Sequence, residues 1–276
     1  MSPLKNQAST PLPRVAAVQL VSGMNLDDNL AQAERLIAEA VGLGAELVAL
    51  PEYFCLMGKR DEDKLLIKEQ EGSGPIQAFL SAQARRHQIV LLGGTLPLDS
   101  NDPGRVFNTS MAYGPDGTLL ARYDKIHLFN FTRGMESYDE ARCIVAGDRP
   151  VVLDVPWGRV GLSTCYDLRF PELYRSQGVL DLIVVPAAFT YTTGQAHWEI
   201  LLRARAIENQ CFVLAAAQGG THPNGRRTWG HSMLIDPWGE VLQCLPEGPG
   251  IVVGPLDLAR QAQIRIDLPA WRHRVL

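Results

Sequence analysis

The chain has 276 residues, 46% of them hydrophobic, and its formal net charge is −4. This composition is sufficient for a large buried core, and the lack of long runs of like charge argues against a nucleic-acid surface. No apolar stretch reaches the ~18 residues that span a bilayer, so we expect a soluble cytoplasmic protein with neither nucleic acid nor membrane as a partner.

The N-terminal stretch MSPLKNQASTPLPR is polar and proline-rich and lacks the apolar core of a signal peptide. We expect residues 1–13 to form a disordered lead-in and residues 14–276 to form one domain, because no change of composition marks a linker. The five cysteines form no C-x-x-C pair and the six histidines are scattered. Neither a disulfide framework nor a structural metal is therefore expected.

Buried strands and amphipathic helices alternate in the first part of the chain. The apolar run at 15–21 predicts a strand, and apolar residues at helical spacing predict a helix after it, capped by Asn25. A second buried strand stops at Pro51, and a helix over about 76–87 leads to a third. Glu52 therefore lies just beyond the carboxyl end of a predicted strand, where α/β proteins commonly bind ligands.

Three hairpins are predicted further along, with turns at GPDG, PWG and DPWG. Lys125 ends the first hairpin and Cys165 follows the second, while residues 128–149 between them are expected to be irregular. A strand, a helix and a second strand are expected between the second and third hairpins. About twelve strands and at least four helices in this order would fit an α/β fold of two mixed sheets packed face to face, with helices outside.

Glu52, Lys125 and Cys165 each follow the end of a predicted strand, and their chemistry is complementary. A thiol is a weak nucleophile until a base such as a carboxylate takes its proton. A neighbouring ammonium can stabilise the thiolate and also the oxyanion that forms when sulfur attacks a carbonyl. The N–H of Tyr166, at a strand-to-helix turn, could be a second oxyanion donor. From the residues alone, a core cysteine and two solvated charges remain an alternative.

Other functions also remain open at this point. Cys165 could pair with His197 or His231 as in papain-like enzymes, although each histidine alone fits a packing role. A thiol-redox or peroxidatic enzyme would need a resolving cysteine or a cysteine pocket of Thr and Arg, and it would not need Glu52. A catalytically silent interaction protein would have a broken triad, whereas all three side chains are present here.

The blocks LPEYF, RYDKIHLF and GLSTCYDLRFPELYR resemble, in this order, the three signature blocks of the nitrilase superfamily of carbon–nitrogen hydrolases. The resemblance covers essentially the whole chain. It implies a four-layer αββα sandwich of two mixed six-stranded sheets, a homodimer or higher homo-oligomer, and no cofactor or metal. It also implies that Cys165 is the nucleophile, Glu52 the general base and Lys125 the oxyanion stabiliser.

The resemblance further implies a second glutamate in the loop after the lysine, which orients the lysine and the substrate amide. The stretch GMESYDEARCIVAGD offers Glu136 and Glu140. The spacing to AGD favours Glu140, and Glu136 is kept as the alternative. Asp124 departs from the family pattern, in which Arg often precedes the lysine, and so changes the charge beside the triad without removing a catalytic group.

Downstream segments resemble the branch that holds the deaminated glutathione amidases and the omega-amidases. The order AAAQGG, THPNGRR and WGHSM favours the former, because omega-amidases tend to carry Ser-Pro where this chain has Ala217 and Gln218. We therefore expect a small carboxylate-bearing amide as substrate, cleaved through a cysteine thioester with release of ammonia. An omega-amidase or another aliphatic amidase is the alternative.

Arg169, four residues beyond the nucleophile, could hold the substrate carboxylate with its guanidinium fork, and an ion pair with Glu172 or another acid is the alternative. By the resemblance, Thr193 and Tyr53 are further candidates for the substrate pocket.

Two other segments carry expectations about partners. Arg226 and Arg227 are expected in an exposed, mobile loop, where they could meet a distal carboxylate of a longer substrate or simply be solvated. The C-terminal LPAWRHRVL is expected to reach a partner subunit, with Trp271 as its anchor.

Overall fold

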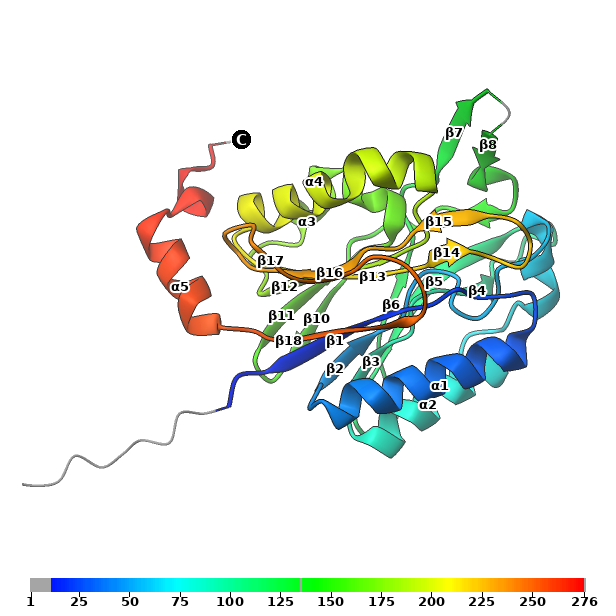
Figure 1. The fold of residues 1–276 in the computed structure, drawn as a ribbon, viewed down its shortest axis with the longest axis horizontal. Coiled ribbons are helices and arrows are strands. Elements are labelled where there is room, and N and C mark those ends of the chain that lie inside the picture. Colours follow the sequence, from blue (N-terminus) through cyan, green and yellow to red (C-terminus); the bar gives the residue numbers. More distant parts are fainter. Residues whose placement is uncertain (1–10, 135, 276) are drawn as a thin grey trace, which may run out of the picture.

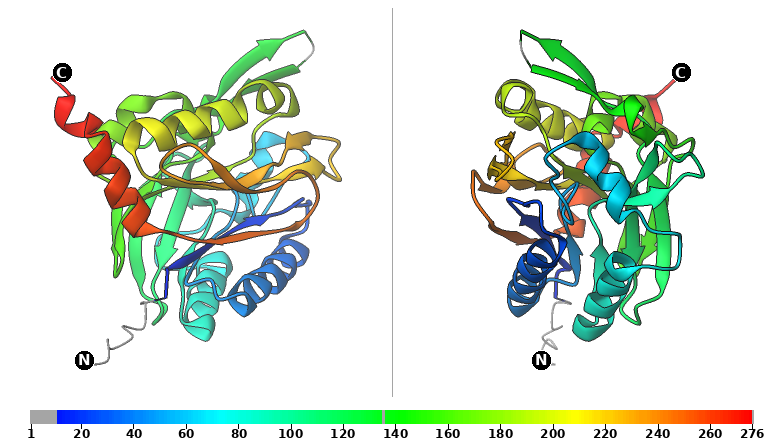
Figure 2. Two further views of the ribbon diagram at one scale, coloured as in Figure 1. Left: turned by 60° about the vertical axis from the view of Figure 1, so that its left-hand side comes forward. Right: turned by 90° about the vertical axis from the view of Figure 1, so that its right-hand side faces the viewer.

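The computed structural model describes residues 11–134 and 136–275. Figures 1 and 2 show a four-layer arrangement in which two sheets face each other and helices cover the outer face of each. This confirms the expected α/β fold. Of the expected lead-in, residues 1–10 lie outside the described residues. Pro13 already contacts the folded part, because its carbonyl accepts a hydrogen bond of 2.8 Å from the N–H of Leu256.

The first sheet holds eight strands rather than the expected six, in the order β18-β1-β2-β3-β5-β4, with β6 and β9 also paired to β5. The reason is the length of β5, whose eight residues allow two short strands on each edge: β3 and β4 on one, β6 and β9 on the other. The strands are β1 (Arg14–Gln19), β2 (Leu47–Ala49), β3 (Val90–Leu92), β4 (Leu96–Asp99), β5 (Val106–Tyr113), β6 (Leu119–Asp124), β9 (Ile144–Val145) and β18 (Gly250–Pro255).

The second sheet has the expected six strands, in the order β10-β11-β12-β13-β16-β17. Its central strands β11, β12 and β13 are parallel, as are β1, β2 and β3 in the first sheet. Helices connect the parallel strands in both sheets. The strands are β10 (Val152–Val155), β11 (Gly158–Leu162), β12 (Leu182–Ala187), β13 (Phe212–Ala217), β16 (Ser232–Ile235) and β17 (Val241–Leu245).

Helices α1 and α2 cover the first sheet, and α3 and α4 cover the second (Figure 1). The helices are α1 (Leu26–Gly42), α2 (Pro75–His87), α3 (Pro171–Ser176), α4 (Tyr191–Asn209) and α5 (Leu258–Asp267), with the 3₁₀ helices η1 (Asp61–Ile67), η2 (Glu140–Arg142), η3 (Cys165–Arg169) and η4 (Ala270–His273). None of the helices within the described ranges is both long and apolar enough to cross a membrane.

The alternation of side chains in β1 explains how the layers are held together. Ala16 and Val18 belong to the apolar cluster that packs against α1 and α2, whereas Val15 and Ala17 belong to the cluster between the two sheets. Successive residues of a strand point to opposite faces, so a strand that is apolar throughout can be buried on both. The predicted strand at 15–21 is therefore a central strand of the sandwich.

Residues 128–149 were expected to be irregular, and this was wrong. They contain the hairpin β7 (Asn130–Arg133) and β8 (Glu136–Asp139), followed by η2 and β9. The hairpin projects from the body of the molecule (Figure 1), so its side chains show no apolar alternation that could have predicted it. A second small hairpin is formed by β14 (Gly219–Thr221) and β15 (Arg227–Trp229).

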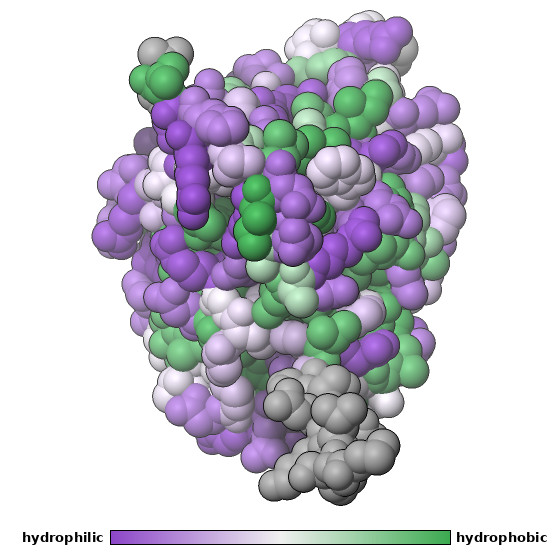
Figure 3. Space-filling model, turned by 90° about the vertical axis from the view of Figure 1, so that its left-hand side faces the viewer, coloured by the Kyte–Doolittle hydropathy of each residue, from purple (hydrophilic) through white to green (hydrophobic). Residues whose placement is uncertain are grey.

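The C-terminal segment packs onto its own chain. The indole N–H of Trp271 donates to the carbonyl of Asn209 (3.1 Å), and the guanidinium of Arg175 lies 4.7 Å from the indole ring centroid. Trp271 therefore anchors the segment within its own chain, and the expected contact with a partner subunit stays a prediction. Figure 3 shows the face that carries α5, on which apolar groups are scattered among polar ones.

Candidate active site

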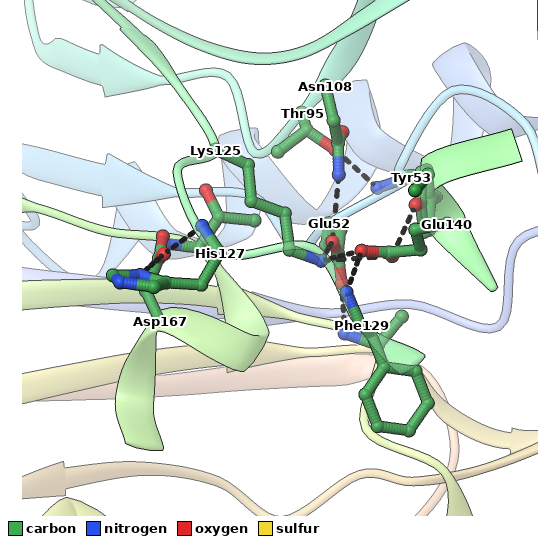
Figure 4. A network of polar contacts seen from close by, with 12 residues as sticks. Glu52, Tyr53, Thr95, Asn108, Lys125, His127, Phe129, Glu140 and Asp167 are labelled. Atoms are coloured by element: carbon green, nitrogen blue, oxygen red, sulfur yellow. Dashed lines mark hydrogen bonds and ion pairs between the residues drawn. The ribbon is translucent and has the colours of Figure 1, made fainter. Parts of the chain in front are cut away.

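Lys125 lies at the centre of a buried polar network (Figure 4). Its Nζ donates to Oε1 of Glu52 at 2.9 Å and to both carboxylate oxygens of Glu140 at 2.9 and 2.7 Å. The side chains of Lys125 and Glu52 are 0% and 1% exposed. Glu140, rather than Glu136, is thus the glutamate in contact with the lysine, whereas Glu136 accepts a hydrogen bond from the hydroxyl of Thr192 (3.1 Å).

The carboxylate of Glu52 is held by donors besides the lysine. Asn108 Nδ2 donates to Oε1 and the backbone N–H of Ala188 donates to Oε2, both at 2.9 Å. Neither residue was predicted from the sequence. The signal for Asn108 was a polar side chain within the strand VFNTSMAY, which is otherwise largely apolar. Ala188 contributes only its backbone, so its side chain carried no signal.

Glu140 is held on its other side by Tyr53 and Phe129. The hydroxyl of Tyr53 donates to Oε1 (3.0 Å) and the N–H of Phe129 donates to Oε2 (2.8 Å). Tyr53 has a φ of 56°, in the left-handed region that non-glycine residues rarely adopt, and its own N–H donates to the hydroxyl of Thr95 (2.9 Å). This backbone turn directs the Tyr53 ring from the end of β2 toward Glu140 and the pocket.

Cys165 is the first residue of η3, with Ser163 and Thr164 between it and the end of β11 at Leu162, and its φ of 50° is also left-handed. Such strain at a strand-to-helix turn is typical of residues that present a nucleophile. Tyr166 is the second residue of η3, where a helix offers its N–H no internal acceptor, so this N–H remains a candidate oxyanion donor.

Asp167 joins the turn at Cys165 to the segment after Lys125. Its Oδ2 accepts from the N–H of Thr164 (2.8 Å) and the hydroxyl of Tyr123 (2.6 Å), and its Oδ1 accepts from the N–H of His127 (3.0 Å). The aspartate is fully buried. It therefore positions two predicted catalytic groups relative to each other, a role that the sequence analysis did not assign.

A pocket with an empty volume of about 350 Å³ opens at these residues. Eight residues that were predicted from the sequence to act in catalysis or to contact the substrate line it: Glu52, Tyr53, Glu140, Cys165, Tyr166, Arg169, Thr193 and Arg226. Lys125 lies behind Glu52 and Glu140 and bridges them. The strand ends that carry these groups thus converge on one cavity, as expected for carboxyl ends of parallel strands.

Arg169 enters the pocket without a carboxylate partner among the described residues, so the alternative ion pair with Glu172 is not formed. Its guanidinium contacts Nδ1 of His197 (3.3 Å) and lies 5.5 Å from the ring centroid of Phe189. Thr193 is buried at the start of α4, with its hydroxyl 2.8 Å from that of Thr190.

The two histidines considered as partners for Cys165 lie elsewhere. His197 contacts Arg169, and His231 stacks on Trp229 at a centroid distance of 4.0 Å. Neither is among the residues that line the pocket. Within residues 11–134 and 136–275, no group of three His, Cys, Asp or Glu side chains could hold a metal ion. The absence of a cofactor stays a prediction.

Comparison with known proteins identifies the family. A model for the carbon-nitrogen hydrolase family matches residues 14–266. The chain belongs to the carbon–nitrogen hydrolase family. This confirms the resemblance seen in the three signature blocks.

This carbon–nitrogen hydrolase is 44% identical, over 94% of its length and 97% of the relative, to a deaminated glutathione amidase of Synechocystis. It is 38% identical to the human omega-amidase NIT2, over 95% of this chain and 94% of the relative. Its structure matches that of the C. elegans NitFhit protein with a TM-score of 0.86 and 37% identity, covering 96% of this chain and 65% of that one.

Burial and the carboxylates determine the proton affinities in the carbon–nitrogen hydrolase site. Burial, and then the charge of Glu52, raise the pKa of the Cys165 thiol well above its usual value, and Lys125 offsets this only in part. Burial alone would lower the pKa of Lys125, but Glu140 and Glu52 outweigh it and raise the pKa well above the usual value. The resting site therefore holds a neutral thiol beside a charged ammonium.

The contact between Glu140 and Lys125 can be tested through the pH dependence of folding stability. Burial alone would raise the pKa of Glu140, but the charge and hydrogen bonds of Lys125 and the N–H of Phe129 outweigh this and hold the pKa below its usual value. A carboxylate whose pKa is lowered by folding stabilises the protein above its unfolded pKa, and this contribution disappears as the pH falls through the folded pKa. We expect Glu140→Gln to destabilise the hydrolase most near pH 7, and progressively less below about pH 4.5.

The measurement is the free energy of unfolding in urea for both proteins between pH 3 and pH 7. Glu136→Gln is the matched control, because Glu136 contacts Thr192 rather than Lys125. A stability difference for Glu140→Gln that is independent of pH would contradict the charged Lys125–Glu140 contact.

Proposed function

We propose that this carbon–nitrogen hydrolase is an amidase that cleaves the linear amide of a small, carboxylate-bearing substrate through a thioester on Cys165. The observation that carries the proposal is the single pocket in which Cys165 lies beside Glu52, with Lys125 bridging Glu52 and Glu140. A nucleophile, a base and a cation are the groups that acyl transfer requires.

In the proposed reaction, Glu52 accepts the proton of Cys165 and the thiolate attacks the amide carbon. Lys125 and the N–H of Tyr166 stabilise the oxyanion of the tetrahedral intermediate. Protonated Glu52 then donates its proton to the leaving nitrogen, the carbon–nitrogen bond breaks, and the thioester remains on the sulfur. Glu52 finally takes a proton from water, whose oxygen attacks the thioester. The carbon–sulfur bond then breaks, and Glu52 returns its proton to the sulfur as the acid leaves.

The hydrogen bonds of the site support this use of Glu52. Asn108 and the N–H of Ala188 each donate to one of its oxygens, which fixes the carboxylate plane inside the pocket. The raised pKa of Cys165 means that the thiol does not ionise on its own near neutral pH, so a positioned base is needed. Glu140 and Tyr53 are assigned the positioning of Lys125 and the substrate amide.

For the substrate, we favour deaminated glutathione, the substrate named for the Synechocystis relative. Arg169 supports a carboxylate on the acyl part, because its guanidinium lies in the pocket beside Thr193 and lacks an acidic partner within the described part of the chain. The amide cleaved in deaminated glutathione is a secondary amide, so its leaving group is the amine of cysteinylglycine. The ammonia expected from the sequence applies to primary amides such as alpha-ketoglutaramate.

The test compares substrates by the acid they release. Deaminated glutathione and alpha-ketoglutaramate share one acyl group and both yield 2-oxoglutarate, which can be followed for both in the same assay. We expect turnover of both, with a higher kcat/KM for deaminated glutathione, and little or none with N-carbamoyl amino acids or simple nitriles. A preference for alpha-ketoglutaramate would favour omega-amidase, the activity in the name of the human relative. Failure to hydrolyse any of these amides would falsify the proposal.

A homo-oligomer remains a proposal. It is supported by large apolar side chains on the outer side of α4, where Ile200 and Ile207 are 70% and 49% exposed. Light scattering at micromolar concentration tests it, and a monomer would contradict it. The cytoplasmic location stays a prediction.

A further inference from the structure

Two adjacent arginines have different surroundings: Arg226 is the last residue of the turn between β14 and β15, and Arg227 is the first residue of β15. Arg226 is among the residues that line the pocket of Cys165, whereas Arg227 is not. The guanidinium of Arg227 donates to Glu247 (3.0 Å) and stacks 3.6 Å from the ring centroid of Tyr191. The sequence pattern does not distinguish the two arginines, but in the fold only Arg226 lines the pocket.

The loop that carries Arg226 is exposed at Pro223 and Gly225, as expected, but hydrogen bonds hold it against neighbouring segments. Figure 1 shows the β14–β15 hairpin beside the segment that leads into η1. Asn224 Nδ2 donates to the carbonyl of Gly58 (2.6 Å), and the N–H of Arg226 donates to Asn224 Oδ1 (2.9 Å). His222 is 2% exposed, and its N–H donates to the carbonyl of Arg226 (2.8 Å). The backbone of Arg226 is therefore held in place before any ligand binds.

The guanidinium of Arg226 has only loose contacts with other side chains. Its nearest acid is Asp61 at 3.7 Å, and it lies 5.2 Å from the ring centroid of Tyr138. No side-chain hydrogen bond satisfies it within the described residues. The Arg226 side chain is 29% exposed, and that of Asp61 is 54% exposed. A half-exposed carboxylate at this distance is a loose partner, which a better placed carboxylate can replace.

Arg226 and Arg169 lie near different parts of the reacting amide. Arg169 lies over the rings of Tyr166 and Phe189, next to the turn that carries the nucleophile. Arg226 and Tyr53 line the pocket of Cys165 together, and both also line a neighbouring cavity beside η1. Tyr53 adjoins Glu52, the group proposed to protonate the leaving nitrogen, so Arg226 lies toward the leaving group.

We propose that Arg226 binds a carboxylate on the leaving group of the substrate, while Arg169 binds a carboxylate on the acyl group. This inference rests on the proposed amidase function. It assigns specificity for amides whose leaving amine ends in a carboxylate, such as a short peptide. Because the leaving group departs when the thioester forms, Arg226 acts on acylation and has no contact with the substrate during deacylation.

The test uses two substrates with the same acyl group, deaminated glutathione and alpha-ketoglutaramate. Their thioesters are identical, so any difference between them arises before the leaving group departs. In Arg226→Gln, we expect the ratio of kcat/KM for deaminated glutathione to that for alpha-ketoglutaramate to fall about tenfold. This is the low end of the effect of losing a hydrogen bond to a charged group, because the Arg226 side chain is partly exposed. Arg227→Gln is the matched control, in which the wild-type ratio is expected.

A third substrate isolates the contact. With the wild-type protein, deaminated glutathione whose terminal carboxylate is converted to a carboxamide should have a kcat/KM about tenfold lower than that of deaminated glutathione itself. In Arg226→Gln the two substrates should have similar kcat/KM values, because the contact is already lost. An unchanged substrate ratio in Arg226→Gln, or a full further loss with the carboxamide, overturns the role of Arg226. A wild-type protein that hydrolyses none of these amides overturns the proposed function instead, so the two failures are distinct.

Discussion

Cys165→Ala is expected to abolish turnover of every amide substrate while leaving the protein folded. Alanine cannot form a thioester, and no other cysteine lines the pocket. The change removes one sulfur atom from a side chain that is 8% exposed, so the loss of folding stability should be small, on the order of 1 kcal/mol. Cys165→Ser should also be inactive, because an alcohol ionises far less readily than a thiol in the same buried position.

The measurement combines product formation with mass spectrometry of the protein quenched during turnover. The wild-type protein should carry the acyl group of the substrate on Cys165, and the alanine variant should carry none. Cys143→Ala is the control, because Cys143 is also buried and lies outside the pocket. Substantial product formation by Cys165→Ala would rule out the thioester mechanism.

Lys125→Met should affect both activity and stability. Removal of one oxyanion donor typically lowers kcat by a factor of about 10²–10³. The variant also leaves Glu52 and Glu140 close together in a buried site without their cation, and removing one member of a buried ion pair typically costs about 3–5 kcal/mol of folding free energy. Lys68→Met is a suitable control, since Lys68 pairs with Asp99 at a more exposed position.

The stability of Lys125→Met should increase as the pH falls, in contrast to the wild-type contribution of Glu140. With the ammonium gone, the two buried carboxylates repel each other, so folding should raise the pKa of at least one of them. A group whose pKa is raised by folding stabilises the protein below its unfolded pKa, about 4.3 for glutamate, and this contribution is lost as the pH rises through the folded pKa. Urea unfolding between pH 4 and pH 8 measures this dependence.

A second change separates the two effects of the lysine. Lys125→Met combined with Glu140→Gln removes the like-charge repulsion, and should recover part of the stability without recovering activity. Near-wild-type kcat in Lys125→Met would remove the lysine from the mechanism. Wild-type stability in Lys125→Met would show that the buried contacts with Glu52 and Glu140 contribute little to folding.

The sequence by itself determined most strands of the two sheets, though not β9, and the helices that connect the parallel strands. It also placed Glu52, Lys125 and Cys165 at strand ends, because strand periodicity and turn chemistry depend on neighbours along the chain. The same local patterns explain why the hairpin β7–β8 was missed: its strands lie outside the core and show no apolar alternation.

Only the tertiary structure decided which polar groups meet in the pocket. Glu140 and Glu136 are only four residues apart, and the fold brings only Glu140 to Lys125. Asn108 and the N–H of Ala188 donate to Glu52 although they are 56 and 136 residues away from it in the chain. Arg226 and Arg227 are adjacent in the chain, but only Arg226 lines the pocket. Such contacts depend on strand order and on the direction of each side chain, which no local pattern encodes.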